Sequence, residues 1–172
     1  MILKTERLVI RHITEKDWKS IKMIWENFNT SEFVQYDIPH NTEDEDVRVR
    51  IAKWAEANCS LAHMFFAVCL KDTVIGYVAC NKREDGYEIG YCFHSAYHGK
   101  GYAKESCLAI FDYLRKIGVR KVTAGTAINN IPSVSLLKSL GFAQVGTEKV
   151  SFYKDSKGND IVFDGGVFEL TI

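Results

Sequence analysis

The sequence predicts an α/β sandwich built around one mixed sheet. Apolar residues at the 3.6-residue period of amphipathic helices alternate with short β-branched or aromatic runs, in the order βααβββαβαββ. The chain has 172 residues, of which 47% are hydrophobic and 26% charged, as in an ordinary globular protein with a core. No internal repeat or Pro/Ser-rich linker divides it, so we expect a single domain over residues 1–172.

The N-terminal third carries signals for one strand and two helices. Residues 8–12 predict a first strand, and apolar residues at helical spacing indicate a helix after it. These residues are Trp18, Ile21, Ile24, Trp25 and Phe28. Thr42 stands three residues before Glu45, a capping-box pattern that predicts the start of a second helix. The acidic run 43–46 would meet the positive end of this helix, which favours a helix start over a metal site.

The remainder of the chain predicts strands and two further helices. Strands are expected at 65–70, 74–80, 87–93 and 119–127, followed by a final hairpin that turns at 156–159. A long helix over 101–117, ending before Gly118, is indicated by an apolar stripe. The stripe consists of Cys107, Ile110, Phe111, Leu114 and Ile117. A shorter, leucine-rich helix is expected to end at Gly141.

Charge, cysteine usage and hydropathy exclude several classes of protein. Lysine plus arginine (22) balance aspartate plus glutamate (22), so the chain has no overall attraction for nucleic acid. The five cysteines form no C-x-x-C pair, which disfavours a zinc ribbon or a disulfide scaffold, and no metal is expected. The longest apolar run, 64–70, is far shorter than the roughly 20 residues of a membrane helix. Charged residues interrupt any signal-peptide core at the start, so we expect a cytoplasmic protein.

The most informative segment lies between the strand at 87–93 and the long helix. It reads His98-Gly99-Lys100-Gly101-Tyr102-Ala103, followed by Lys104. Glycines at a helix N-terminus let backbone amides converge on an anion such as a phosphate, helped by the helix dipole. A tight connection without a ligand explains the glycines alone equally well. The G-x-x-x-x-G-K-S/T pattern of a P-loop and the third glycine of a dinucleotide-binding fold are both missing, which disfavours those folds.

This segment resembles the acetyl-CoA diphosphate loop of the GNAT superfamily of N-acetyltransferases, R/Q-x-x-G-x-G/A, with His98 in place of the usual Gln or Arg. A second match resembles the family's later helix and strand entry: Asn130-x-x-Ser133-x-x-Leu136-Leu137-x-x-Leu140-Gly141-Phe142. Two further segments resemble the branch typified by ribosomal-protein alanine N-acetyltransferases. They are Thr5-Glu6-Arg7-Leu8 with Arg11, and Glu88-Ile89-Gly90-Tyr91. The resemblance covers nearly the whole chain and is weakest over 13–62, the region that shapes the acceptor pocket in this family.

The resemblance implies a GNAT-like three-layer sandwich, with a central mixed, mostly antiparallel sheet flanked by helices. It also implies direct transfer of acetyl from acetyl-CoA to a primary amine, without a covalent enzyme intermediate. By the same resemblance, the backbone of Tyr91, Cys92 and Phe93 binds the pantetheine arm and thioester, and Asn130 and Ser133 lie near the pantetheine and the sulfur. The diphosphate is held by backbone amides and lysine charges from His98, Gly99, Lys100, Gly101, Tyr102, Ala103 and Lys104.

Two residues are the candidate catalytic groups. Glu88 is expected to be the general base, acting directly or through water, although a solvent-facing glutamate at a strand edge would look the same in sequence. Ser133 is expected to help protonate the leaving thiolate, or alternatively to cap the start of its helix. Many superfamily members have a tyrosine four residues later, where this chain has Leu137.

The acceptor is the least constrained part of the prediction. Trp25, Phe33, Tyr36 and Trp54 are candidates for lining an acceptor cleft, although aromatic residues at helical spacing usually belong to the core. The leading hypothesis is an N-acetyltransferase for a protein N-terminal α-amine. A small-amine (polyamine-like) acetyltransferase and a non-catalytic CoA-binding sensor module stay open. A monomer or a homodimer fits equally, with no nucleic-acid or membrane partner.

Overall fold

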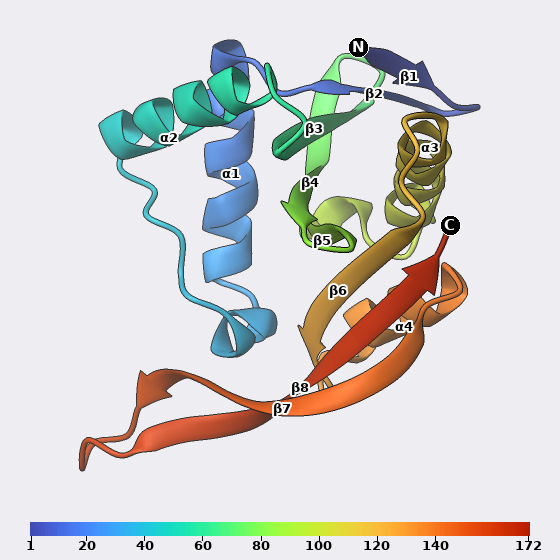
Figure 1. The fold of residues 1–172 in the computed structure, drawn as a ribbon. Helices are drawn as coiled ribbons and strands as arrows, with labels where there is room; N and C mark the ends of the chain where they lie inside the picture. Colours follow the sequence, from blue (N-terminus) through green and yellow to red (C-terminus); the bar gives the residue numbers. More distant parts are fainter.

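The computed structural model describes all residues from 1 to 172, with helices on both faces of one eight-stranded sheet (Figure 1). The strands follow the spatial order β1-β2-β3-β4-β5-β6-β8-β7, and all neighbours are antiparallel except β5 and β6. Their bounds are β1 Ile2–Lys4, β2 Leu8–His12, β3 His63–Leu70, β4 Thr73–Arg83, β5 Gly86–Phe93, β6 Lys121–Ala127, β7 Ala143–Lys154 and β8 Asp160–Thr171. The predicted sandwich with a mixed, mostly antiparallel sheet is confirmed.

Four α-helices and three short 3-10 helices connect the strands. They are η1 Glu15–Asp17, α1 Trp18–Asn29, η2 Glu32–Tyr36, α2 Asp44–Ala57, η3 Ser95–Tyr97, α3 Tyr102–Lys116 and α4 Ile131–Ser139. The apolar stripe expected on α3 is its buried face, apart from Ile117, which is exposed at the C-cap. The chain leaves α3 through Gly118, whose φ of +88° is a left-handed conformation that favours glycine. None of the helices has the length and apolar character that crossing a bilayer requires.

Two features of the N-terminal third differ from the prediction. A short additional strand, β1, pairs with β2 at the edge of the sheet; its three residues are too few to show a periodic pattern. Helix α2 begins at Asp44 with Glu43 as its N-cap, so Thr42 does not form the predicted capping box. The side chain of Asn41 takes that place: it accepts from the Glu43 amide at 2.9 Å and donates to Asp46 at 2.6 Å.

The core lies in two clusters, one on each face of the sheet. The larger cluster contains the buried side chains of α3 and α4, and the smaller one contains those of α1 and α2. Side chains alternate along β5: Tyr87, Ile89 and Tyr91 face the larger cluster, whereas Cys92 packs against the smaller one. By the same alternation, Glu88 lies on the α1/α2 face.

The pairing between β5 and β6 is very short. Only two residue pairs join these strands, Tyr87 with Val122 and Glu88 with Thr123. Beyond Glu88, β5 continues to pair with β4 as far as Phe93, while β6 turns away to pair with β8 (Figure 1). The sheet is therefore split between β5 and β6, and the C-terminal half of β5 has a neighbour on one side only.

The long β7–β8 hairpin reaches beyond the body of the sheet towards η2 (Figure 1). The hydroxyl oxygen of Tyr153 on β7 lies 2.8 Å from the carbonyl oxygen of Val34 and 2.6 Å from that of Asp37, and the two carbonyls share its one hydrogen. The rings of Tyr36 and Phe163 meet edge to face, with centroids 5.5 Å apart. These contacts tie the segment between α1 and α2 to the C-terminal hairpin.

Candidate functional site

The glycine-rich loop ends directly at the N-terminus of α3. Gly99 and Gly101 have φ values of +70° and +81°, so both need glycine's freedom in the left-handed region. Gly101 is the N-cap of α3, and no side chain caps the helix. The first amides of α3, from Tyr102, Ala103 and Lys104, therefore have no partner within the helix and are available to an anion.

Two side chains of the loop, those of His98 and Lys100, fold back onto the chain that precedes it. Nε2 of His98 donates to the carbonyl oxygen of Phe93 at 2.8 Å. Nζ of Lys100 donates to the carbonyl oxygen of Ala96 at 2.8 Å. Lys104 is exposed and has no ion-pair partner. In this conformation His98 and Lys100 order the loop, and Lys104 is the lysine whose charge is free to meet a ligand.

A hydrogen bond joins β5 to α4 beside the split. The hydroxyls of Tyr91 and Ser133 lie 2.8 Å apart. Asn130 is the N-cap of α4, because its side chain accepts from the Ser133 amide at 3.3 Å. The alternative role of Ser133 as the helix cap is therefore wrong, and its hydroxyl is free to bond with Tyr91.

The environment keeps Tyr91 protonated. Burial raises the pKa of its phenol, more strongly than the hydrogen bond with Ser133 lowers it, so the hydroxyl is neutral at physiological pH. The side chain of Tyr91 is an addition to the predicted site, which included only the backbone of this residue. The position four residues after Ser133 is filled by Leu137, which is fully buried in the larger core cluster.

Glu88 occupies the last position at which β5 and β6 are paired. It lies on a central strand rather than at a sheet edge, opposite Asn81 on β4 and Thr123 on β6. Its side chain is 40% exposed, and its carboxylate accepts from Nε of Arg83 at 2.8 Å. Glu88 and Tyr91 thus flank the split from opposite faces of the sheet, about 10 Å apart along the strand. No hydrogen bond links Glu88 to Ser133.

The ion pair between Arg83 and Glu88 was not predicted, although the sequence contains a signal for it. Arg83 pairs with Gly86 across the β4–β5 turn, so Arg83 and Glu88 occupy diagonal positions on one face of the hairpin. Charges of opposite sign at such positions are within reach of each other.

Of the four candidate acceptor aromatics, Trp25 belongs to the core and Trp54 is half-buried against it. Trp25 is fully buried and donates from Nε1 to the Tyr77 hydroxyl at 3.0 Å. Trp54 stacks on Phe65, with ring centroids 4.4 Å apart. Phe33 and Tyr36 lie half-buried on η2 and remain candidates for contact with an acceptor.

The cysteines and acidic residues do not form a metal-binding group. All five cysteines are free, and no three His, Cys, Asp or Glu side chains converge as metal ligands. Asp44 in the acidic run forms an ion pair with Lys22 and lies in the first turn of α2. Burial raises the pKa of the Cys92 thiol to about 12, so this cysteine beside the split is not a thiolate at neutral pH.

Comparison with known proteins identifies the family. The model of the acetyltransferase (GNAT) domain matches residues 7–143, which include the loop, the split and α4. The chain belongs to the GNAT acetyltransferase family. It is thus a GNAT-type N-acetyltransferase, and the family uses acetyl-CoA as the acetyl donor.

Relatives of this GNAT protein match it over nearly its full length. The N-acetyltransferase YnaD of Bacillus subtilis (strain 168) is 32% identical over 168 residues, covering 93% of this chain and 91% of YnaD. A GNAT-family acetyltransferase from Bacillus anthracis has a similar structure, with a TM-score of 0.80, 26% identity and coverage of 99% and 98%. RimL, a ribosomal L7/L12 α-N-protein acetyltransferase solved with coenzyme A, has a TM-score of 0.88, 17% identity and coverage of 100% and 98%.

Proposed function

We propose that this GNAT protein transfers the acetyl group of acetyl-CoA to the α-amine of a protein N-terminus. The observation that carries the proposal is the split between β5 and β6, directly followed along the chain by the glycine-rich loop. An extended backbone without a second partner strand suits the amide groups of a pantetheine arm. A helix N-terminus without a capping side chain suits a diphosphate.

The residues of the loop fit the diphosphate of the donor. A Cβ built on Gly99 would have nothing within 4 Å, so the space beside this glycine is open. The amides of Gly101, Tyr102 and Ala103 would contact the diphosphate oxygens, with Lys104 adding positive charge. The backbone of Tyr91, Cys92 and Phe93 would hold the pantetheine arm and the thioester, and Asn130 would place Ser133 near the sulfur.

The two steps of the transfer take place on opposite faces of the sheet at the split: attack by the amine on one face, and protonation of the leaving thiolate on the other. The neutral amine attacks the thioester carbonyl carbon from the α1/α2 face, and its excess proton passes through water to the Glu88 carboxylate. The carbon–sulfur bond breaks, and the departing thiolate takes a proton from the Ser133 hydroxyl, which regains one from solvent. Either hydroxyl of the Tyr91–Ser133 pair can donate; with the Tyr91 phenol as the donor to Oγ of Ser133, the serine hydrogen would be free to point at the sulfur. Attack by Cys92 is disfavoured because its thiol is protonated.

The acceptor assignment rests on two supports. RimL, which acts on the α-amine of a ribosomal protein, resembles this chain in fold from end to end. In addition, Phe33 and Tyr36 lie on a segment that Tyr153 holds against the β7–β8 hairpin, on the side of the sheet from which the amine would approach. A short peptide segment held beside these aromatic rings would present its first amine to the split.

A peptide screen tests this proposal. The purified protein is incubated with acetyl-CoA and peptides that begin with different residues, and mass spectrometry locates the added acetyl group. Matched peptides with blocked N-termini and internal lysines serve as controls, and spermidine represents the small amines. Acetylation of free N-termini alone supports the proposal. Acetylation of spermidine alone would instead indicate the small-amine enzyme, and CoA binding without any turnover would indicate the sensor module.

A further inference from the structure

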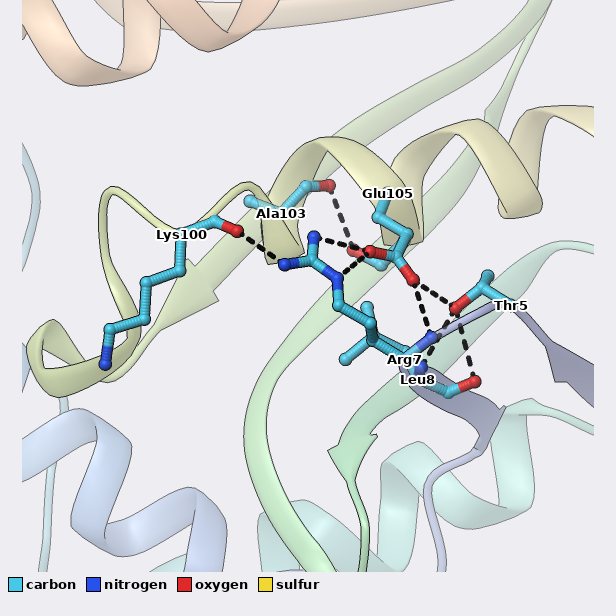
Figure 2. A network of polar contacts seen from close by, with 7 residues as sticks. Thr5, Arg7, Leu8, Lys100, Ala103 and Glu105 are labelled. Carbon is cyan, nitrogen blue, oxygen red and sulfur yellow. Dashed lines mark hydrogen bonds and ion pairs between the residues drawn. The ribbon is translucent and has the colours of Figure 1, made fainter.

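Arg7 lies behind the glycine-rich loop and contacts both the loop and α3 (Figure 2). Its Nη1 donates to the carbonyl oxygen of Lys100 at 3.0 Å. Its Nε and Nη2 reach Oε2 of Glu105, in the first turn of α3, at 2.7 Å and 2.6 Å. The guanidinium carbon also lies 4.6 Å from the centre of the Tyr102 ring. One side chain from the segment before β2 therefore holds the loop and the helix that follows it.

The other half of this network fixes Glu105. The hydroxyl of Thr5 and the backbone amide of Arg7 both donate to Oε1 of Glu105 (Figure 2). The Thr5 oxygen in turn accepts from the Leu8 amide at 2.9 Å. Burial alone would raise the pKa of Glu105, but the hydrogen bonds from Thr5 and Arg7 and the charge of Arg7 together lower it. The carboxylate is therefore ionised and bonded on both oxygens.

The bond from Arg7 to Lys100 determines which way one peptide group points. In a trans peptide, the carbonyl of one residue and the N–H of the next point in opposite directions. Because Arg7 holds the Lys100 carbonyl towards itself, the Gly101 N–H must point away from Arg7. A Cβ on Gly101 would lie 3.4 Å from Nη2 of Arg7, which places the guanidinium directly against the back of this residue.

We propose that Arg7 is a positioning residue for CoA: with Glu105 it fixes the Lys100–Gly101 peptide so that amide donors, and not a carbonyl oxygen, face the diphosphate. This inference rests on the proposed function of the loop. It also gives a role to the Thr5-Glu6-Arg7-Leu8 segment, which the transfer chemistry leaves unexplained. Without Arg7, the peptide can rotate and bring its carbonyl dipole towards the anion, which weakens binding.

A direct effect of charge is the competing explanation, and two variants separate it from positioning. Arg7→Lys keeps the positive charge but loses the fork that bonds Lys100 and Glu105 together. Glu105→Gln removes a negative charge beside the loop, so Coulomb attraction alone would tighten the binding of an anion. Positioning predicts weaker binding for both variants. Arg115→Met is the matched control, because it removes an arginine of similar exposure that pairs with Asp112 near the other end of α3.

The experiment measures CoA binding by calorimetry and turnover with two donors, acetyl-CoA and S-acetyl-pantetheine, which lacks the diphosphate. For Arg7→Lys and Glu105→Gln we expect about a five- to tenfold rise in the Kd of CoA and the KM of acetyl-CoA, with kcat unchanged. Turnover of S-acetyl-pantetheine should match the wild type, and Arg115→Met should behave as the wild type throughout.

Each contrary outcome has a distinct meaning. Wild-type affinity in Arg7→Lys, or tighter CoA binding in Glu105→Gln, would overturn positioning in favour of simple charge. Equal losses with both donors would overturn it in favour of a general structural defect, which thermal unfolding would also reveal. Absence of CoA binding in the wild type would instead refute the proposed function of the loop, and the inference with it.

Discussion

The hydrogen bond between Tyr91 and Ser133 leads to a sharp test of the transfer chemistry. Tyr91→Phe removes only the phenolic oxygen, which lies 2.8 Å from the serine hydroxyl between two half-buried side chains. The loss of such a bond costs about 1 kcal/mol of stability and lowers Tm by about 2–4 °C in a domain of this length. Because Ser133 then lacks the donor that orients it, we expect kcat to fall by about tenfold, with KM for acetyl-CoA unchanged.

The assay is release of free CoA thiol at saturating acetyl-CoA and peptide, alongside thermal unfolding by circular dichroism. Tyr87→Phe is the matched control: Tyr87 faces the same core from the same strand, and its hydroxyl donates to the Leu61 carbonyl at 2.6 Å, away from the split. It should lose similar stability and keep its kcat. Combining Tyr91→Phe with Ser133→Ala should be no worse than Ser133→Ala alone. Wild-type kcat in Tyr91→Phe, or full additivity in the double variant, would refute this reasoning.

Three further changes test other parts of the molecule. Gly101→Glu adds a side chain at a left-handed position, at about 1–2 kcal/mol of strain, and places a carboxylate against Arg7, where it competes with the Lys100 carbonyl. Calorimetry should therefore show CoA affinity reduced more than about tenfold, and retained affinity would show that the conformation of this loop does not determine CoA binding. Glu88→Gln should lower kcat by about 10²–10⁴, whereas undiminished turnover would reject Glu88 as the base. Burial lowers the pKa of His12, whose Nε2 has no hydrogen-bond partner, so the unfolded state binds more protons below about pH 6.5. Stability should thus fall on acidification to about pH 5, less so in His12→Leu; identical pH profiles of Tm would contradict this.

Local patterns predicted the elements and the loop well, because their causes lie within a few residues. The stripe of α3, the β3–β4 hairpin and the glycine turn follow from periodicity and from the backbone freedom of glycine, and each is observed. The predicted capping box was wrong for an equally local reason. The neighbouring Asn41 accepts a hydrogen bond from the Glu43 amide at the same helix start.

The contacts that position the site could not be predicted, because they join residues far apart in sequence. Ser133 and Tyr91 are 42 positions apart, and Arg7 and Glu105 are 98 apart. Each bond depends on how a helix packs against the sheet, which periodicity does not specify. The same reason explains Trp25: its helical spacing placed it on an apolar face, but only the packing of α1 on β4 decided that it is core.

The brief pairing of β5 with β6 has a consequence for the response to temperature. The two halves of the sheet, β1 to β5 and β6 to β8, are joined by only two residue pairs, so buried apolar contacts such as those of Ile89, Phe111 and Phe168 supply most of their cohesion. Hydrophobic cohesion weakens on cooling. We therefore expect the two halves to separate on cooling before the strands within each half do. The β5–β6 junction would then be the origin of any cold sensitivity of the enzyme.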